Sequence, residues 1–245
     1  MKRFLVFCLL LVSLAGFAAA DDLGIDAGLE VGFGDVADEF EFSLTPKAIY
    51  ENSFGNIDVY AEANYTIIFN DDLDQSIYLE EEAAYNLPIN ETMLSFILNN
   101  QNNFYFIDAM DDDVDGVIEP SVKYAFSNFF AQLGFPIYYQ PDTAVDTYLC
   151  LAYYNYGFGA ELTGTFNIDP DAEMASYNLL LNYEQDRFYV EVEMEADKEF
   201  DVFFINPYAE FYIDRITVWA GVDFGNIGGE GDVTVAPYIG ASYSF

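Results

Sequence analysis

Apolar and polar residues alternate along most of the chain, and this alternation is its dominant pattern. In the clearest stretch, 188–197, one face carries Phe188, Val190, Val192, Met194 and Ala196. The opposite face of that stretch carries Tyr189, three glutamates and Asp197, and similar alternation occurs at 23–33 and 57–69. A period of two residues is typical of a β-strand with two different faces, and no stretch after residue 22 sustains a helical period. The sequence therefore predicts an all-β fold.

Short clusters rich in Asp, Asn, Gly and Pro separate the alternating stretches, and such residues favour turns. This punctuation predicts about fourteen strands. The expected spans are 23–33, 40–50, 57–69, 76–86, 91–108, 117–126, 129–139, 147–156, 158–168, 174–183, 188–197, 202–213, 216–224 and 233–245. Because consecutive strands are joined by short connections, we expect an antiparallel up-and-down β-barrel of twelve to sixteen strands.

The connections differ between the two ends of the predicted barrel. Those at one end are very short, as at Ser127–Asn128 and Asp214–Arg215. Those at the other end are longer and more acidic, as at 70–75, 109–116 and 225–232. Outer-membrane barrels have short periplasmic turns and longer outer loops, and their tilted strands need about 9–11 residues to cross the bilayer. The pattern therefore favours a transmembrane barrel.

Two further features of the strands lead to predictions about register and membrane position. Prolines recur at similar positions in the strands that follow the longer connections. Because proline lacks the backbone N–H that would donate a hydrogen bond to the next strand, these prolines predict local bulges. These prolines are Pro46, Pro120, Pro207 and Pro237. Glu81 lies on the otherwise apolar parity, which predicts a bulge or register shift within 76–86.

Aromatic residues end several of the returning strands: Tyr50, Tyr85, Tyr124, Tyr183 and Phe211. A ring of aromatic side chains at this level is typical of the interfacial girdle of a membrane barrel. Ordinary sheet packing is the alternative, because Tyr and Phe favour strands in any β-protein.

Composition decides which face meets water. The chain is 53% hydrophobic and 18% aromatic, yet it has 43 acidic residues against 7 basic ones. A compact soluble globule of this charge would repel itself, and a free protein surface usually mixes both signs. The polar faces carry Gly, Ser, Thr, Asn and Tyr beside carboxylates and almost no Lys, as a wetted lumen would. We therefore expect the apolar faces to meet lipid, with a soluble secreted β-protein as the alternative.

The first 20 residues have the layout of a cleavable signal peptide. Basic residues at Lys2 and Arg3 precede an apolar run, 4–17, and three alanines end at Ala20. We expect cleavage after Ala20, which leaves 21–245 as a single barrel domain. The run is too short for a membrane anchor, and no cysteine stands at the cleavage point as a lipoprotein would require.

Removal of the signal peptide leaves Cys150 as the only cysteine, so no intramolecular disulfide can form. It also leaves 5 basic residues against 43 acidic ones, a net charge of −38. Nucleic acid is therefore excluded as a partner.

The closing residues alternate up to a terminal aromatic residue: Val233, Val235, Pro237, Ile239, Ala241, Tyr243 and Phe245. Here the sequence resembles bacterial outer-membrane β-barrel proteins of the porin-like type. The resemblance implies location in the outer membrane, contact with its lipid, and recognition of the strand ending in Phe245 by the barrel assembly machinery.

The chain has no histidine, so Ser-His-Asp and Cys-His triads are absent, as is the commonest metal ligand. Outer-membrane proteases, phospholipases and acyltransferases that resemble this architecture generally rely on a histidine. Carboxylate pairs such as Glu191 and Glu193 also serve glycosidases. With 43 acids in the chain, chance proximity explains such pairs better. We therefore expect no enzymatic activity.

The stretch 111–119 contains the spacing D-x-D-x-D-G, in which alternate side chains can converge on one Ca²⁺ ion. The candidate ligands are Asp111, Asp113 and Asp115. Val122 stands where the calcium-loop pattern has a bidentate glutamate, and Glu119 could partly substitute for it. The alternative is a solvated acidic turn without a metal.

Strand parity directs a set of carboxylates into the predicted lumen: Asp58, Glu62, Glu80, Glu82, Glu191, Glu193, Glu195 and Glu210. Only Lys47 and Lys123 oppose them within strands. The sequence therefore predicts a porin-like diffusion channel that prefers cations and passes small cationic or neutral solutes. The alternative is a structural or surface-interaction barrel that does not conduct because its own side chains plug it.

Overall fold

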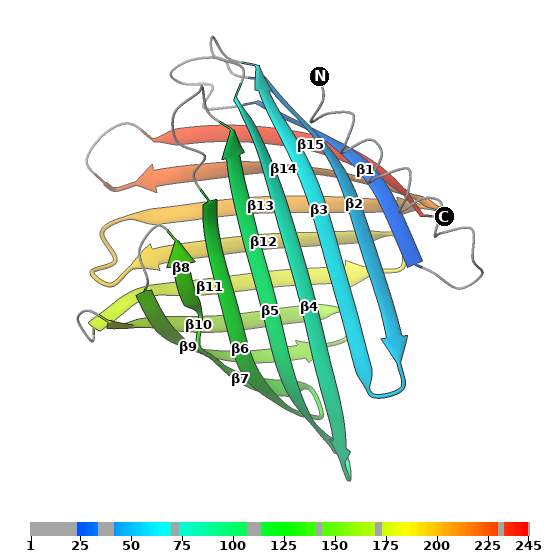
Figure 1. Cartoon of the computed structure of the whole chain (residues 1–245), viewed down its shortest axis with the longest axis vertical. Helices are drawn as coiled ribbons and strands as arrows, with labels where there is room; N and C mark the ends of the chain where they lie inside the picture. Colours follow the sequence, from blue (N-terminus) through cyan, green and yellow to red (C-terminus); the bar gives the residue numbers. More distant parts are fainter. Residues whose placement is uncertain are drawn as a thin grey trace.

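The computed structural model describes residues 24–33, 42–69, 74–106, 114–140, 144–169, 173–229 and 233–244. They form one antiparallel sheet of fifteen strands (Figure 1). The strands are β1 (Gly24–Phe33), β2 (Phe42–Phe54), β3 (Ile57–Phe69), β4 (Gln75–Ile89), β5 (Thr92–Phe106), β6 (Val114–Phe126), β7 (Phe129–Gly134), β8 (Ile137–Gln140), β9 (Ala144–Asn155), β10 (Phe158–Asp169), β11 (Glu173–Gln185), β12 (Phe188–Asp197), β13 (Phe203–Ile213), β14 (Ile216–Ile227) and β15 (Thr234–Ser244).

The sheet closes into a barrel because β1 pairs with β2 along one edge and with β15 along the other (Figure 1). The short strands β7 and β8 together occupy one strand position in the barrel. Both pair with β6 on one side and with β9 on the other, and Phe135 and Pro136 separate them. The barrel is therefore fourteen-stranded when β7 and β8 are counted as one strand. The predicted antiparallel up-and-down barrel of about fourteen strands is confirmed.

The two ends of the barrel differ as the sequence predicted. At one end each of the six connections between described strands has two residues: 55–56, 90–91, 127–128, 156–157, 186–187 and 214–215. Positive φ angles at Gly55 (67°), Asn90 (56°) and Asp214 (55°) suit the tight turns whose twist matches that of the strands. At the other end the strands are three to eight residues apart in the sequence.

Large apolar side chains lie on the outside of the barrel. Leu151, Leu162 and Leu179 stand side by side on neighbouring strands, and Leu151 and Leu162 are each about half exposed, at 51% and 52%. Among the described residues few apolar side chains are buried, and of these only Tyr65 and Trp219 are large. A contiguous apolar outer wall of this kind needs a nonpolar surrounding, which a bilayer provides. None of the described residues belongs to a helix of the length and apolarity needed to span a membrane.

The aromatic residues predicted to form a girdle lie on this outer face, near the two-residue turns. Tyr85 and Tyr124 are each 47% exposed and Phe211 is 57% exposed. Outward aromatic residues beside the turns extend the ring, and Phe129 packs on Tyr153 with ring centroids 4.7 Å apart. The rings therefore mark one rim of the apolar wall.

The predicted bulges at the prolines are wrong. The pairs Leu29–Pro46, Leu98–Pro120, Val192–Pro207 and Val222–Pro237 all stand in unbroken register. A proline removes one N–H on one side of its strand only, so the other neighbour is unaffected. Between β2 and β3, Thr45 and Pro46 have no paired residue, and pairing continues from Lys47 in the same register. Register shifts occur elsewhere, for example between Phe203 and Ile205.

The predicted register shift within 76–86 is also wrong. The strand β4 pairs with β3 and with β5 in one continuous register, and Glu81 stands opposite Ala61 and Asn100. Glu81 therefore keeps the outward parity, and its side chain is exposed on the apolar wall. The strand tolerates it because backbone pairing does not depend on which side chains face outward.

We predict that arginine at position 162 destabilises the barrel by about 2–4 kcal/mol, because Leu162 faces outward in the middle of β10. Arginine at the neighbouring Thr163, which faces the acidic interior, should cost roughly 0.5 kcal/mol or less. Denaturant titration of both variants in lipid vesicles measures the free energy of unfolding. Equal costs at the two positions would contradict the assignment of faces.

Candidate functional site

The inner face of the barrel is polar and acidic. A cavity of about 800 Å³ is lined by residues of strands from both sides of the β1–β15 closure, including Glu30, Lys47, Glu62, Glu210 and Asp223. Residues of separate strands converge in this way only on the concave side of a closed sheet. The structure places all eight predicted lumen carboxylates on this inner parity: Asp58, Glu62, Glu80, Glu82, Glu191, Glu193, Glu195 and Glu210.

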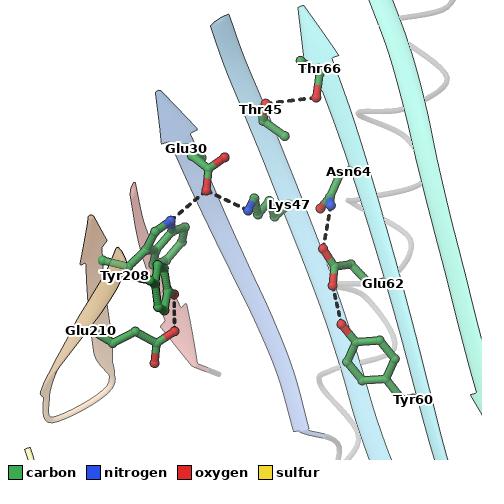
Figure 2. Close-up of polar contacts among 10 residues, drawn as sticks. Glu30, Thr45, Lys47, Tyr60, Glu62, Asn64, Thr66, Tyr208 and Glu210 are labelled. Carbon is green, nitrogen blue, oxygen red and sulfur yellow. Dashed lines mark hydrogen bonds and ion pairs between the residues drawn. The ribbon is translucent and has the colours of Figure 1, made fainter. Parts of the chain in front are cut away.

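Glu30 of β1 contacts Lys47 of the neighbouring strand β2 and also Trp219 of β14, which is separated from β1 by β15. Figure 2 shows the contact between Lys47 and Glu30. The Lys47 Nζ and the Trp219 Nε1 each donate a hydrogen bond of 2.8 Å to the same Glu30 oxygen, Oε2. The Lys47 ammonium also lies 5.5 Å from the centroid of the Trp219 ring. Trp219 reaches β1 from β14 by lying over Gly240 of β15, where an added Cβ would stand 2.3 Å from the indole. The glycine is therefore required for this contact.

A repeated Tyr-x-Glu motif supplies phenol donors to the lumen carboxylates. It occurs on four strands, as Tyr60/Glu62, Tyr78/Glu80, Tyr189/Glu191 and Tyr208/Glu210. Residues two apart share one face of a strand, and in each pair the phenol O–H donates to the carboxylate, at 2.7 Å for Tyr78 and Glu80. Figure 2 shows two of these pairs. The sequence prediction missed this motif, although its spacing is visible in the sequence.

Side-chain amides provide further donors to the same carboxylates. Glu80 accepts hydrogen bonds from Asn99 at 2.6 Å and from Gln101 at 3.1 Å, both on β5. Glu62 accepts one from Asn64 at 2.5 Å, and Asn178 donates to Glu193 at 2.6 Å. Neutral donors rather than cations thus solvate these acids, so hydrogen bonding leaves their negative charge uncompensated.

Few basic residues offset the lumen acids. Among the described residues, Lys47 and Lys123 are the only basic residues within strands. Lys47 is paired with Glu30, and the Lys123 ammonium lies 3.8 Å from the centroid of the Phe130 ring. At the rim, Lys198 donates to Glu173 at 2.7 Å, and this hydrogen bond raises the pKa of the Lys198 ammonium. The interior therefore carries a strong negative charge.

Three tyrosines form a row along one side of the lumen. Tyr208 lies between Tyr189 and Tyr238, with ring centroids 6.3 Å from each. Gly221 makes room for this row, because an added Cβ there would stand 2.3 Å from the Tyr238 ring. Aromatic faces attract cations, so this side of the lumen adds to the effect of the carboxylates.

The predicted calcium ligands are only partly within the described residues. Asp111 and Asp113 lie outside them, whereas Asp115 and Glu119 both belong to β6. Four residues of extended strand separate the Cα atoms of these two by about 13 Å. Glu119 instead accepts a hydrogen bond of 2.5 Å from Tyr148. The described residues contain no group of three or more potential metal ligands, and the calcium site stays a prediction.

No protein-family model matches the chain. No curated protein matches it either. Among solved structures, a mutant of the Rh. blastica porin is 10% identical, with a TM-score of 0.49 and coverage of 91% of this chain and 100% of that chain. A triple mutant of the Rhodopseudomonas blastica porin is 9% identical, with a TM-score of 0.48 and the same coverage. At these values the likeness carries no argument about function. The closed topology of the chain itself confirms the predicted antiparallel β-barrel.

Proposed function

We propose that the chain is an outer-membrane diffusion channel whose acidic lumen prefers cations. One observation carries this proposal: a closed barrel directs eight predicted carboxylates inward, and only two lysines of the described strands oppose them. The apolar outer wall supports a place in the lipid bilayer. Small cationic or neutral solutes are the proposed cargo, and the chain acts as a passage rather than a catalyst.

Electrostatics gives the selectivity. Fixed negative charges inside a wall of low dielectric constant create a potential that concentrates cations and excludes anions. Glu62, Glu80 and Glu210 accept hydrogen bonds from neutral donors, so the potential of these carboxylates is not cancelled locally. The effect falls with salt, since the screening length is about 10 Å at 0.1 M and about 3 Å at 1 M.

A barrel plugged by its own side chains is the second candidate. The observation that favours it is the presence of large side chains on the inner face, since Trp219, Tyr208 and Tyr238 all line the cavity. Such a barrel would serve a structural or surface-interaction role. Single-channel recording separates the two candidates, because a plugged barrel gives no conductance.

The first prediction concerns location. We expect a mature chain that starts at Asp21 and fractionates with the outer membrane, since 1–20 has the layout of a signal peptide and the barrel wall is apolar. Amino-terminal sequencing and membrane fractionation measure this, with the mobility of boiled and unboiled protein as a check on folding. Protein that is soluble and monodisperse without detergent would overturn the proposed location.

The second prediction concerns selectivity. In a planar bilayer under a KCl gradient, the reversal potential should have the sign for K⁺ over Cl⁻ and shrink between about 0.1 M and 1 M salt. Replacing Glu191, Glu193 and Glu195 together by Gln should lower the K⁺/Cl⁻ permeability ratio at least about twofold, because all three face the lumen from β12. Acidification should also weaken the preference.

The control for this measurement is Glu81→Gln, which removes one negative charge from the outer wall. It should leave the reversal potential unchanged. Lys47→Met should strengthen the cation preference, because it removes one of two lumen lysines. Anion preference at neutral pH would refute the channel proposal, and the absence of any conductance would favour the plugged barrel.

We also propose that Asp111, Asp113 and Asp115, of which Asp115 lies at the start of β6, bind Ca²⁺ weakly through alternate carboxylates. Calorimetric titration with CaCl₂ should give heat that Asp113→Ala abolishes and Asp112→Ala largely keeps, since residue 112 has the other parity. Identical heats for the native chain and both variants would leave only a solvated acidic turn.

A further inference from the structure

Glu81 places a carboxylate on the lipid-facing wall of the barrel. Tyr85, in the aromatic girdle, is four residues further along β4. At a rise of about 3.3 Å per residue and a tilt of about 45°, this puts Glu81 roughly 9 Å from the girdle along the membrane normal. The apolar band of a membrane barrel is about 25 Å tall. Glu81 therefore lies near the middle of the bilayer.

Asn100 adds a second polar side chain directly beside Glu81. It stands directly opposite Glu81 on β5, and both positions have outward parity. Within the part of the chain that the structure describes, neither side chain has a hydrogen bond or ion pair. A carboxylate and an amide that face acyl chains without partners are unfavourable, because lipid offers no hydrogen bonds.

Several small residues lie near Glu81 on this part of the wall, beside the larger Leu79 and Leu98. Ala61 stands opposite it on β3, Ala83 follows two residues along β4, and Ala63 stands opposite Leu79. The strands β3, β4 and β5 lie side by side in Figure 1. Small side chains let another protein surface approach closely inside a membrane.

We propose that the wall formed by β3, β4 and β5 is the interface of a two-fold symmetric dimer of this chain. In it, Glu81 of each protomer accepts a hydrogen bond from the partner's Asn100. Glutamate offers acceptor oxygens and asparagine offers two N–H donors, so the two side chains are complementary. A two-fold axis brings residue i to residue j and j to i at once. A second copy therefore satisfies all four polar groups in one arrangement.

This arrangement leaves each lumen intact, because Glu81 and the lumen acids have opposite parity along their strands. The dimer proposal thus stands independently of the channel proposal. Conductance tests one of them and association tests the other.

The test uses the full chain with two single variants, Glu81→Leu and Asn100→Leu, and the adjacent lumen variant Glu82→Gln as the matched control. Sedimentation equilibrium in detergent and energy transfer between labelled chains in lipid vesicles measure association. The native chain and Glu82→Gln should dimerise. Each leucine variant alone should dimerise about tenfold more weakly or worse, since it loses both hydrogen-bonded pairs. The mobility of boiled and unboiled protein verifies that each variant folds.

Mixing the two leucine variants gives the sharpest result. A mixed dimer keeps one pair, between Glu81 of the Asn100→Leu chain and Asn100 of the Glu81→Leu chain, whereas neither variant keeps a pair by itself. The mixture should therefore associate more tightly than either variant alone. A monomeric native chain, undiminished association of both variants, or a mixture no tighter than its components would each overturn the proposal.

Discussion

The fold depends on the pairing of β1 with β15, which joins the first and last described strands of the chain. Backbone N–H and C=O groups have no hydrogen-bond partners in lipid, so a sheet crosses a bilayer only if it has no free edge. Closure meets this requirement and also defines an inside. Once the sheet is closed, the alternation of each strand separates an apolar outer wall from an acidic inner one. The chain can then be both 53% hydrophobic and strongly anionic.

Closure also explains how the inner face holds so many acids. Carboxylates that point toward one another in a confined space need donors. The same strands supply them through Tyr-x-Glu pairs, and neighbouring strands supply them through inward amides such as Asn99. The two glycines at 221 and 240 let aromatic rings lie flat against the wall, so the Trp219 indole reaches across β15 to Glu30. The resulting surface is anionic but hydrogen-bonded, which is the physical basis for attraction of cations.

The sequence was sufficient for the architecture because strand parity is a local property. Alternation predicted the fourteen-stranded barrel, and it predicted that Glu191 and Glu193 face inward. The sequence predicted one strand over 129–139, whereas the structure has two short strands there, β7 and β8. The contact of Glu30 with Trp219 could not be predicted, since it joins strands that become near neighbours only after closure. The bulges expected at the prolines were wrong because a strand keeps its register when one backbone hydrogen bond is missing. The register shift expected near Glu81 was wrong because a polar side chain on the outer face does not disturb backbone pairing.

The separation of the two faces is the central claim, and spin-label accessibility along β12 tests it most directly. Labels on single cysteines at positions 190 to 195, in a Cys150→Ser background in lipid vesicles, report contact with oxygen in lipid or with a neutral nickel chelate in water. The structure predicts that labels at Val190, Val192 and Met194 meet oxygen, while labels replacing the three glutamates meet the chelate. A profile without a period of two, or one with the faces reversed, would contradict the account.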